Sequence, residues 1–249
     1  MNRERWYFSV FPGLLCVAAN QWQILLDSGT PVAWMGLSAC LLARLTLQPQ
    51  PAAAQRPSSA LLDRASTPLF LAYAGAGLGY ILPMTFLPAL ARAQLPADDP
   101  LLSAAWRWTA LACLASIALW NALGSHLGDR RALLWSYLLQ AIGCAAPLLM
   151  PGTIGLLLCA VLVGGTFMGS VLLTQRLART LQPHQGIRLS AALIALYGGA
   201  QLAGPWLAGL WLGHGGNLEQ SFAFGTLAIL WALLWSWFIP PHPTHHTGA

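Results

Sequence analysis

The residues of this sequence best suited to chemistry are uncharged polar side chains that lie inside long apolar runs. Tyrosine, threonine, asparagine and glutamine side chains donate and accept hydrogen bonds without carrying a charge, which suits recognition of a small polar molecule. Each could instead hydrogen-bond to the backbone of a neighbouring helix. The candidates are Tyr73, Tyr80, Thr85, Asn121, Gln140, Thr166, Tyr197 and Gln201.

The motifs of catalysis and metal binding are weak by comparison. Neither HExxH nor GxSxG occurs, and the five cysteines lie in apolar runs without a CxxC pair. The histidines of the tail PPHPTHHTGA could bind a metal weakly, but this composition is typical of a disordered tail. We therefore expect no enzyme activity, no metal site and no cofactor.

Composition shows which elements must position the polar residues. The chain is 57% hydrophobic and only 8% charged, whereas soluble domains carry about 25% charged residues. A bilayer is crossed by about 20 apolar residues of helix. Eight runs approach that length, the first two being weaker: 7–26, 31–47, 68–91, 108–127, 132–150, 154–174, 189–213 and 221–239. The sequence predicts an all-α polytopic membrane protein with about eight transmembrane helices and the lipid bilayer as its partner.

The arginines predict how these spans are oriented in the membrane. There is no lysine, and ten of the twelve arginines fall on one side if the chain starts in the cytoplasm; only Arg92 and Arg107 fall outside. Basic residues concentrate in cytoplasmic loops, so both termini are predicted to be cytoplasmic. Because the arginines are scattered between apolar runs, we expect no nucleic-acid binding.

The stretch AYAGAGLGYILPMTFLPALAR is the most unusual of the predicted helices. Its glycines follow GxGxG rather than the GxGxxG of nucleotide loops, and no strand pattern precedes them. Glycines let membrane helices approach closely, and prolines are tolerated there. Gly75, Gly77 and Gly79 followed by Pro83 and Pro88 predict a closely packed, bent helix. Further packing and bending positions are Gly165, Gly169, Gly204 and Pro205.

Four segments follow from these patterns. Residues 1–47 hold the two weaker runs, and residues 68–239 hold the six strong ones. Between them, residues 48–67 are rich in Pro, Ala, Gln and Ser, which is typical of a flexible linker. Residues 240–249 form the tail.

The loop LGSHLGDRRALL joins two of the strong runs and places Asp129, Arg130 and Arg131 at the turn. Such groups can pair with each other, with a neighbouring helix end or with lipid headgroups. Residues 127–130 resemble the L-A-D-R portion of the cytoplasmic loop of major facilitator superfamily (MFS) transporters. Ser125 stands where that motif begins with glycine. The resemblance implies that Asp129 and Arg130 latch the cytoplasmic side.

Longer phrases extend this resemblance. GLGYILPMTFLPALAR, GGTFMG and YGGAQLAGPWLAG are similar to the bacterial YbfB/YjiJ-like branch of the superfamily. The resemblance implies a transporter of a small solute in the bacterial inner membrane, which works by alternating access of two halves around a central site. It favours Tyr80, Thr85 and Gln201 as cavity residues, because these three lie in the resembling motifs.

The chain departs from the superfamily pattern in length. Members have twelve spans, so the eight here resemble the C-terminal six-helix half and two helices of the N-terminal half. The first hypothesis is a secondary transporter, or the C-terminal part of one. A truncated product that does not transport is the second, and a membrane-embedded enzyme is the third. The six strong runs hold no carboxylate away from their ends, so no proton-coupling group is evident.

Overall fold

A computed structural model describes residues 60–241 of the chain. The weaker runs 7–26 and 31–47, most of the linker and the end of the tail lie outside the described residues. Within residues 60–241 the structure is all helical: α3 (Thr67–Gln94), α4 (Leu101–Leu127), α5 (Asp129–Leu149), α6 (Thr153–Leu181), α7 (Gly186–Gly213) and α8 (Leu218–Trp237). Each of these helices is long and apolar enough to cross a membrane. The six strong runs are thus confirmed as helices of a polytopic membrane protein.

The helices extend beyond the apolar runs that predicted them. The run in α6 ends at Thr174, but the helix continues to Leu181, and the Gln182 N–H still bonds to the Ala178 carbonyl. Hydropathy falls there because Thr174, Gln175 and Arg176 are polar. Backbone hydrogen bonding does not stop at a polar side chain, so an apolar run gives only the minimum length of a helix.

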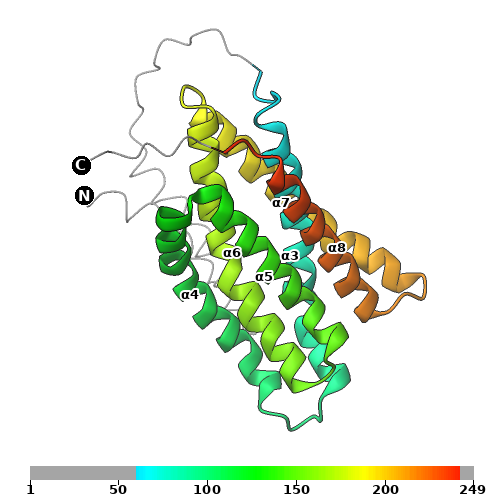
Figure 1. Cartoon of the computed structure of the whole chain (residues 1–249). Coiled ribbons are helices and arrows are strands. Elements are labelled where there is room, and N and C mark those ends of the chain that lie inside the picture. Colours follow the sequence, from blue (N-terminus) through cyan, green and yellow to red (C-terminus); the bar gives the residue numbers. More distant parts are fainter. Residues whose placement is uncertain (1–59, 242–249) are drawn as a thin grey trace, which may run out of the picture. The chain divides into compact units, whose positions relative to one another are not determined.

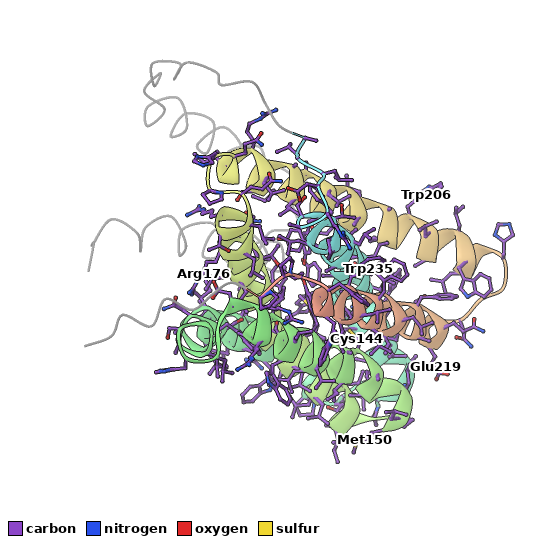
Figure 2. The ribbon with its side chains drawn as sticks, turned by 45° about the horizontal axis from the view of Figure 1, so that its top comes forward. Cys144, Met150, Arg176, Trp206, Glu219 and Trp235 are labelled. Carbon is purple, nitrogen blue, oxygen red and sulfur yellow. The ribbon has the colours of Figure 1, made fainter. Side chains whose placement is uncertain are left out.

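The helices pack around α6 and α3. Helices α4 and α5 pack along α6, α8 packs against α3 and α5, and α7 packs against α3. Figure 1 shows α4 at one side of this six-helix bundle and the α7–α8 pair at the other. Helices α4 and α7 bury the smallest share of their length in the bundle. In Figure 2, Trp206 lies on the outer side of α7, where 64% of its surface is exposed.

The alternating glycines bring α3 close to two helices. A Cβ atom on Gly79 would lie 2.6 Å from the side chain of Ile229 in α8, and one on Gly77 would lie 3.0 Å from Ala200 in α7. Real Cβ atoms essentially never approach as closely as 2.6 Å and seldom as closely as 3.0 Å, so glycine favours both contacts. Helix α3 runs without interruption through Pro83 and Pro88.

A second glycine contact joins α4 to α6. The ring of Trp120 lies against Gly169, and its indole N–H donates to the carbonyl of Gly165 at 2.7 Å. The Gly169 N–H donates to the hydroxyl of Ser116 at 3.0 Å. Because Gly165 and Gly169 have no side chains, the large Trp120 ring is buried directly against the backbone of α6. In α7, Gly204 packs against Ile81, and Pro205 is half-buried inside the helix.

Candidate functional site

Stacked aromatic rings from three helices meet inside the bundle. The ring centroids of Tyr73 and Tyr197 are 4.4 Å apart, and those of Tyr80 and Tyr197 are 5.8 Å apart. On its other side Tyr80 stacks on Phe167 of α6, with 4.2 Å between centroids and 6° between planes. The rings from α3, α7 and α6 therefore form one continuous stack. Such stacking adds to the packing energy of the rings.

A fourth tyrosine reaches this stack from α5. Tyr137 is close enough to Tyr73 and Tyr197 to interact with them electrostatically. We call Tyr73, Tyr80, Tyr137 and Tyr197 the tyrosine cluster. Tyr73 and Tyr137 are fully enclosed, whereas Tyr80 and Tyr197 keep 8% and 6% of their surface exposed. All four are therefore buried; we call Tyr73 and Tyr137 the inner part of the cluster, and Tyr80 and Tyr197, which keep a small exposed fraction, its edge.

Uncharged polar side chains contact the cluster at both parts. At the edge, the Gln201 amide donates to the Tyr80 hydroxyl at 3.0 Å. In the inner part, the Gln175 carboxamide approaches the Tyr73 hydroxyl and the Thr174 hydroxyl approaches that of Tyr137, but neither pair makes a hydrogen bond of ordinary geometry. Phenol and carboxamide groups recognise a ligand by hydrogen bonding. They are poor nucleophiles, so the arrangement suits binding rather than covalent catalysis.

The structure brings together some of the residues predicted from sequence. Tyr73, Tyr80, Tyr197 and Gln201 all belong to the cluster or bond to it. Gln140 lies one helical turn after Tyr137 on the buried face of α5. These predictions rested on residue type and on position within an apolar run, which is how the interior of a membrane bundle shows itself in a sequence.

Three other candidates lie elsewhere. Thr85 is exposed on α3. Thr166 is buried, but its hydroxyl donates to the carbonyl of Leu162 in its own helix at 2.7 Å. Asn121 is exposed near the end of α4, where its side chain accepts a hydrogen bond from Arg176 at 3.2 Å. The structure therefore does not bring these three to the tyrosine cluster.

Sequence reasoning missed Tyr137, Thr174 and Gln175. The signal for Tyr137 was its spacing of three residues from Gln140, which places both on one helical face. The apolar run 154–174 ends at Thr174, so Gln175 lay outside the predicted span. Because α6 continues past both, Thr174 is buried in the bundle and Gln175 is half-buried.

The turn between α4 and α5 holds a second polar group of residues. Gly128 alone joins the two helices, with φ +84°, a conformation that side-chain-bearing residues rarely adopt. Next to it, Asp129 pairs with Arg176 of α6 at 3.0 Å, and Arg176 also bonds to Asn121. We call Asn121, Asp129 and Arg176 the junction cluster. It ties α4 and α5 to α6.

The two arginines of the turn behave differently. The guanidinium of Arg130 donates to the carbonyl of Trp237, at the end of α8, and lies 6.0 Å from the centre of that indole ring. Arg131 is exposed. Asp129 therefore pairs with an arginine of another helix. Arg130 bonds to the end of a neighbouring helix, which is one of the partners considered from sequence.

At the same end of the bundle, the segment before α3 is anchored to α6. Gln182 donates to the Leu61 carbonyl at 3.2 Å and to the Asp63 carboxylate at 2.9 Å. Asp63 also accepts from the backbone N–H of Ser66 at 2.7 Å. Partial burial raises the pKa of Asp63, but the hydrogen bonds from Ser66, Gln182 and Ala65 outweigh it and hold the pKa below its ordinary value.

Comparison with known proteins identifies the family. A family model described as "Uncharacterised MFS-type transporter YbfB" matches residues 14–236. The chain belongs to this family. The resemblance to the major facilitator superfamily is thereby confirmed. No curated protein matches the chain.

Membership of the YbfB family makes the chain an integral membrane transporter of an unidentified solute. It favours a non-enzymatic protein, in agreement with the uncharged polar groups of the tyrosine cluster. The family match includes residues 14–26 of the first weaker run and all of the second, 31–47, both of which lie outside the described residues.

Proposed function

We propose that this chain moves a small solute across the membrane by secondary-active transport with alternating access. In such transporters the solute binds near the middle of the bilayer, where two helix bundles meet. The edge of the tyrosine cluster supplies a surface of this kind. Tyr80, Tyr197 and Gln201 contact the solute in this proposal.

The observation that carries the proposal is the Gln201–Tyr80 hydrogen bond at the edge of an aromatic stack. Apolar pockets with a few well-placed polar groups are typical of small-molecule sites. Here the aromatic rings supply the apolar surface. The Gln201 amide and the Tyr80 hydroxyl supply the hydrogen-bonding groups that orient a solute. The stack continues inward to fully buried residues, which hold the rings of Tyr80 and Tyr197 in place.

The junction cluster has a different role in the proposal. Asp129 and Arg176 close one end of the bundle, and Arg130 holds the end of α8. We place this end at the cytoplasm, because the arginines concentrate there, and we place both termini of the chain on the same side. The bilayer is the bacterial inner membrane, and the runs 7–26 and 31–47 are two further helices.

The alternative is a membrane protein that does not itself transport, as expected of a truncated form. An uptake experiment separates the two. Cells that express the full chain and cells with an empty vector are incubated in a defined mixture of small metabolites. After washing, their contents are compared by mass spectrometry. We expect a several-fold difference for at least one solute.

Variants connect that difference to the site. Tyr80→Phe removes a hydroxyl and keeps the ring, and Gln201→Leu removes its partner. Each should lower the uptake by about tenfold, the effect of losing one hydrogen bond. Trp206→Ala is the matched control on the outer side of α7. If the chain is expressed and inserted in the membrane but the cellular level of no solute changes, the non-transporting alternative holds.

A further inference from the structure

Gln140 carries two polar atoms that the described residues leave without a partner. The residue is 1% exposed, and neither its amide nitrogen nor its amide oxygen makes a hydrogen bond within residues 60–241. A buried amide without partners costs free energy, and buried polar groups are nearly always satisfied. Gln140 therefore bears this cost unless another molecule completes its hydrogen bonding.

More such atoms lie around Tyr137, one turn earlier on the same helix. The Tyr197 hydroxyl is also buried without a partner in the described part of the chain, and it lies near Tyr137. The same holds for the amide nitrogen of Gln175 in α6, whose carboxamide approaches the Tyr73 hydroxyl. Buried, uncharged polar atoms without partners thus come from three helices of the bundle, α5, α6 and α7. We call Gln140, Gln175 and Tyr197 the inner polar site.

The chemistry of these atoms defines what can bind. The two amide nitrogens donate, the Gln140 amide oxygen accepts, and the Tyr197 hydroxyl does both. A hydroxyl or carboxamide group satisfies both kinds of atom. An ionised group would lie in a low-dielectric interior with only neutral partners, which is costly. Arg176, which follows Gln175 in α6, is already engaged with Asp129 in the junction cluster.

We propose that the inner polar site binds an uncharged hydroxyl or carboxamide group of the transported solute, with Gln140 as the specificity-determining residue. This inference rests on the proposed transport function and names its substrate class. Water offers the same hydrogen bonds, so the experiment must separate a solute from a water molecule.

The first measurement is the thermal stability of the purified full chain without solute. Gln140→Leu and Gln140→Met remove the unpaired amide while keeping its approximate volume, so both should raise the melting temperature by a few degrees. Ser236→Ala is the control, because that buried hydroxyl already donates to the Ala232 carbonyl and its loss should not stabilise. A lowered melting temperature in both Gln140 variants would show that the amide has partners and would overturn the proposal.

The second measurement uses three probes of similar size: propionamide, propionate and propylammonium. Propionamide alone should raise the melting temperature of the wild-type chain. Gln140→Leu and Tyr197→Phe should each weaken its binding by about tenfold, and Ser236→Ala should leave it unchanged. A response to the charged probes only, or to none, would overturn the proposal; the latter result leaves water as the occupant.

Failure of the proposed function shows itself differently. If propionamide binds through Gln140 but the chain in proteoliposomes moves no solute, the site stands and the transport proposal fails. If solute is moved and Gln140→Leu moves it at the same rate and KM, the transport proposal stands and the inner polar site is overturned.

Discussion

At the scale of single residues, Asp63 shows how polar side chains fix a loop to the bundle. Its carboxylate bonds to Ser66, Ala65 and Gln182, and these bonds are stronger to the ionised form than to the acid. The pKa of Asp63 is therefore held below its ordinary value of 3.8.

This depressed pKa predicts a pH dependence of stability. A group with a lower pKa in the folded state stabilises the fold at pH values above its unfolded pKa. The contribution should be present at pH 7 and lost as the pH falls below about 4. Asp63→Asn should thus lower the melting temperature at pH 7 and have little effect near pH 3. An equal difference at both pH values would contradict this assignment.

Residue identity predicted part of the candidate site. Tyr73, Tyr80, Tyr197 and Gln201 were recognisable because a polar side chain inside an apolar run must face the bundle. Thr85 and Asn121 satisfied the same criterion and lie exposed instead. The sequence does not show how each helix is rotated about its own axis, and that rotation decides which polar residues point into the bundle.

At the scale of helices, glycine contacts decide how closely α3 approaches α8. Gly79 faces Ile229 and the Gly225 carbonyl, at 2.6 Å and 2.7 Å from where a Cβ atom would be. Gly79→Ala should therefore lower the free energy of unfolding by about 1–3 kcal/mol through overpacking. The measurement is thermal unfolding of the full chain in detergent.

A matched variant gives that prediction its control. Gly198 also lies within a helix, but among the described residues no atom outside its own helix backbone and its two chain neighbours lies within 4 Å of its Cβ position. Gly198→Ala should be neutral or stabilise slightly, because alanine has the higher helix propensity. Equal destabilisation by the two variants would show that loss of glycine itself, rather than the α3–α8 contact, is responsible.

The junction cluster makes a second prediction at this scale. Asp129→Asn and Arg176→Gln each remove one charge of the 3.0 Å pair, and the double variant removes both. The pair is partly exposed, so a double-mutant cycle on thermal stability should give a coupling of about 1 kcal/mol. Arg131→Gln, an exposed arginine of the same turn, should show no coupling to Asp129. Additive effects of Asp129→Asn and Arg176→Gln would mean that the pair contributes nothing.

Helix positions were more predictable than helix ends. Six apolar runs located α3 to α8, because a bilayer demands about 20 consecutive apolar residues. Thr174 and Gln175 show why the ends were missed. Polar residues inside a helix resemble, in a sequence, the polar residues that end a helix, and α6 continues past both to Leu181.

At the scale of the whole molecule, the orientation in the membrane is open to direct measurement. The arginine distribution predicts that the C-terminus faces the cytoplasm. A fluorescent protein that matures only in the cytoplasm, fused after Ala249, should fluoresce. Alkaline phosphatase, active only outside the cytoplasm, should be inactive at the same position. The reverse pair of signals would invert the map and place the junction cluster outside.

The bond from Arg130 to Trp237 has a consequence for how the protein is made. Arg130 is synthesised about a hundred residues before its partner, Trp237. Helix α5 is therefore made before the carbonyl to which Arg130 donates. The contact closes only when α8 is complete. Chains whose synthesis stops before Trp237 therefore lack the hydrogen bond that joins the start of α5 to the end of α8.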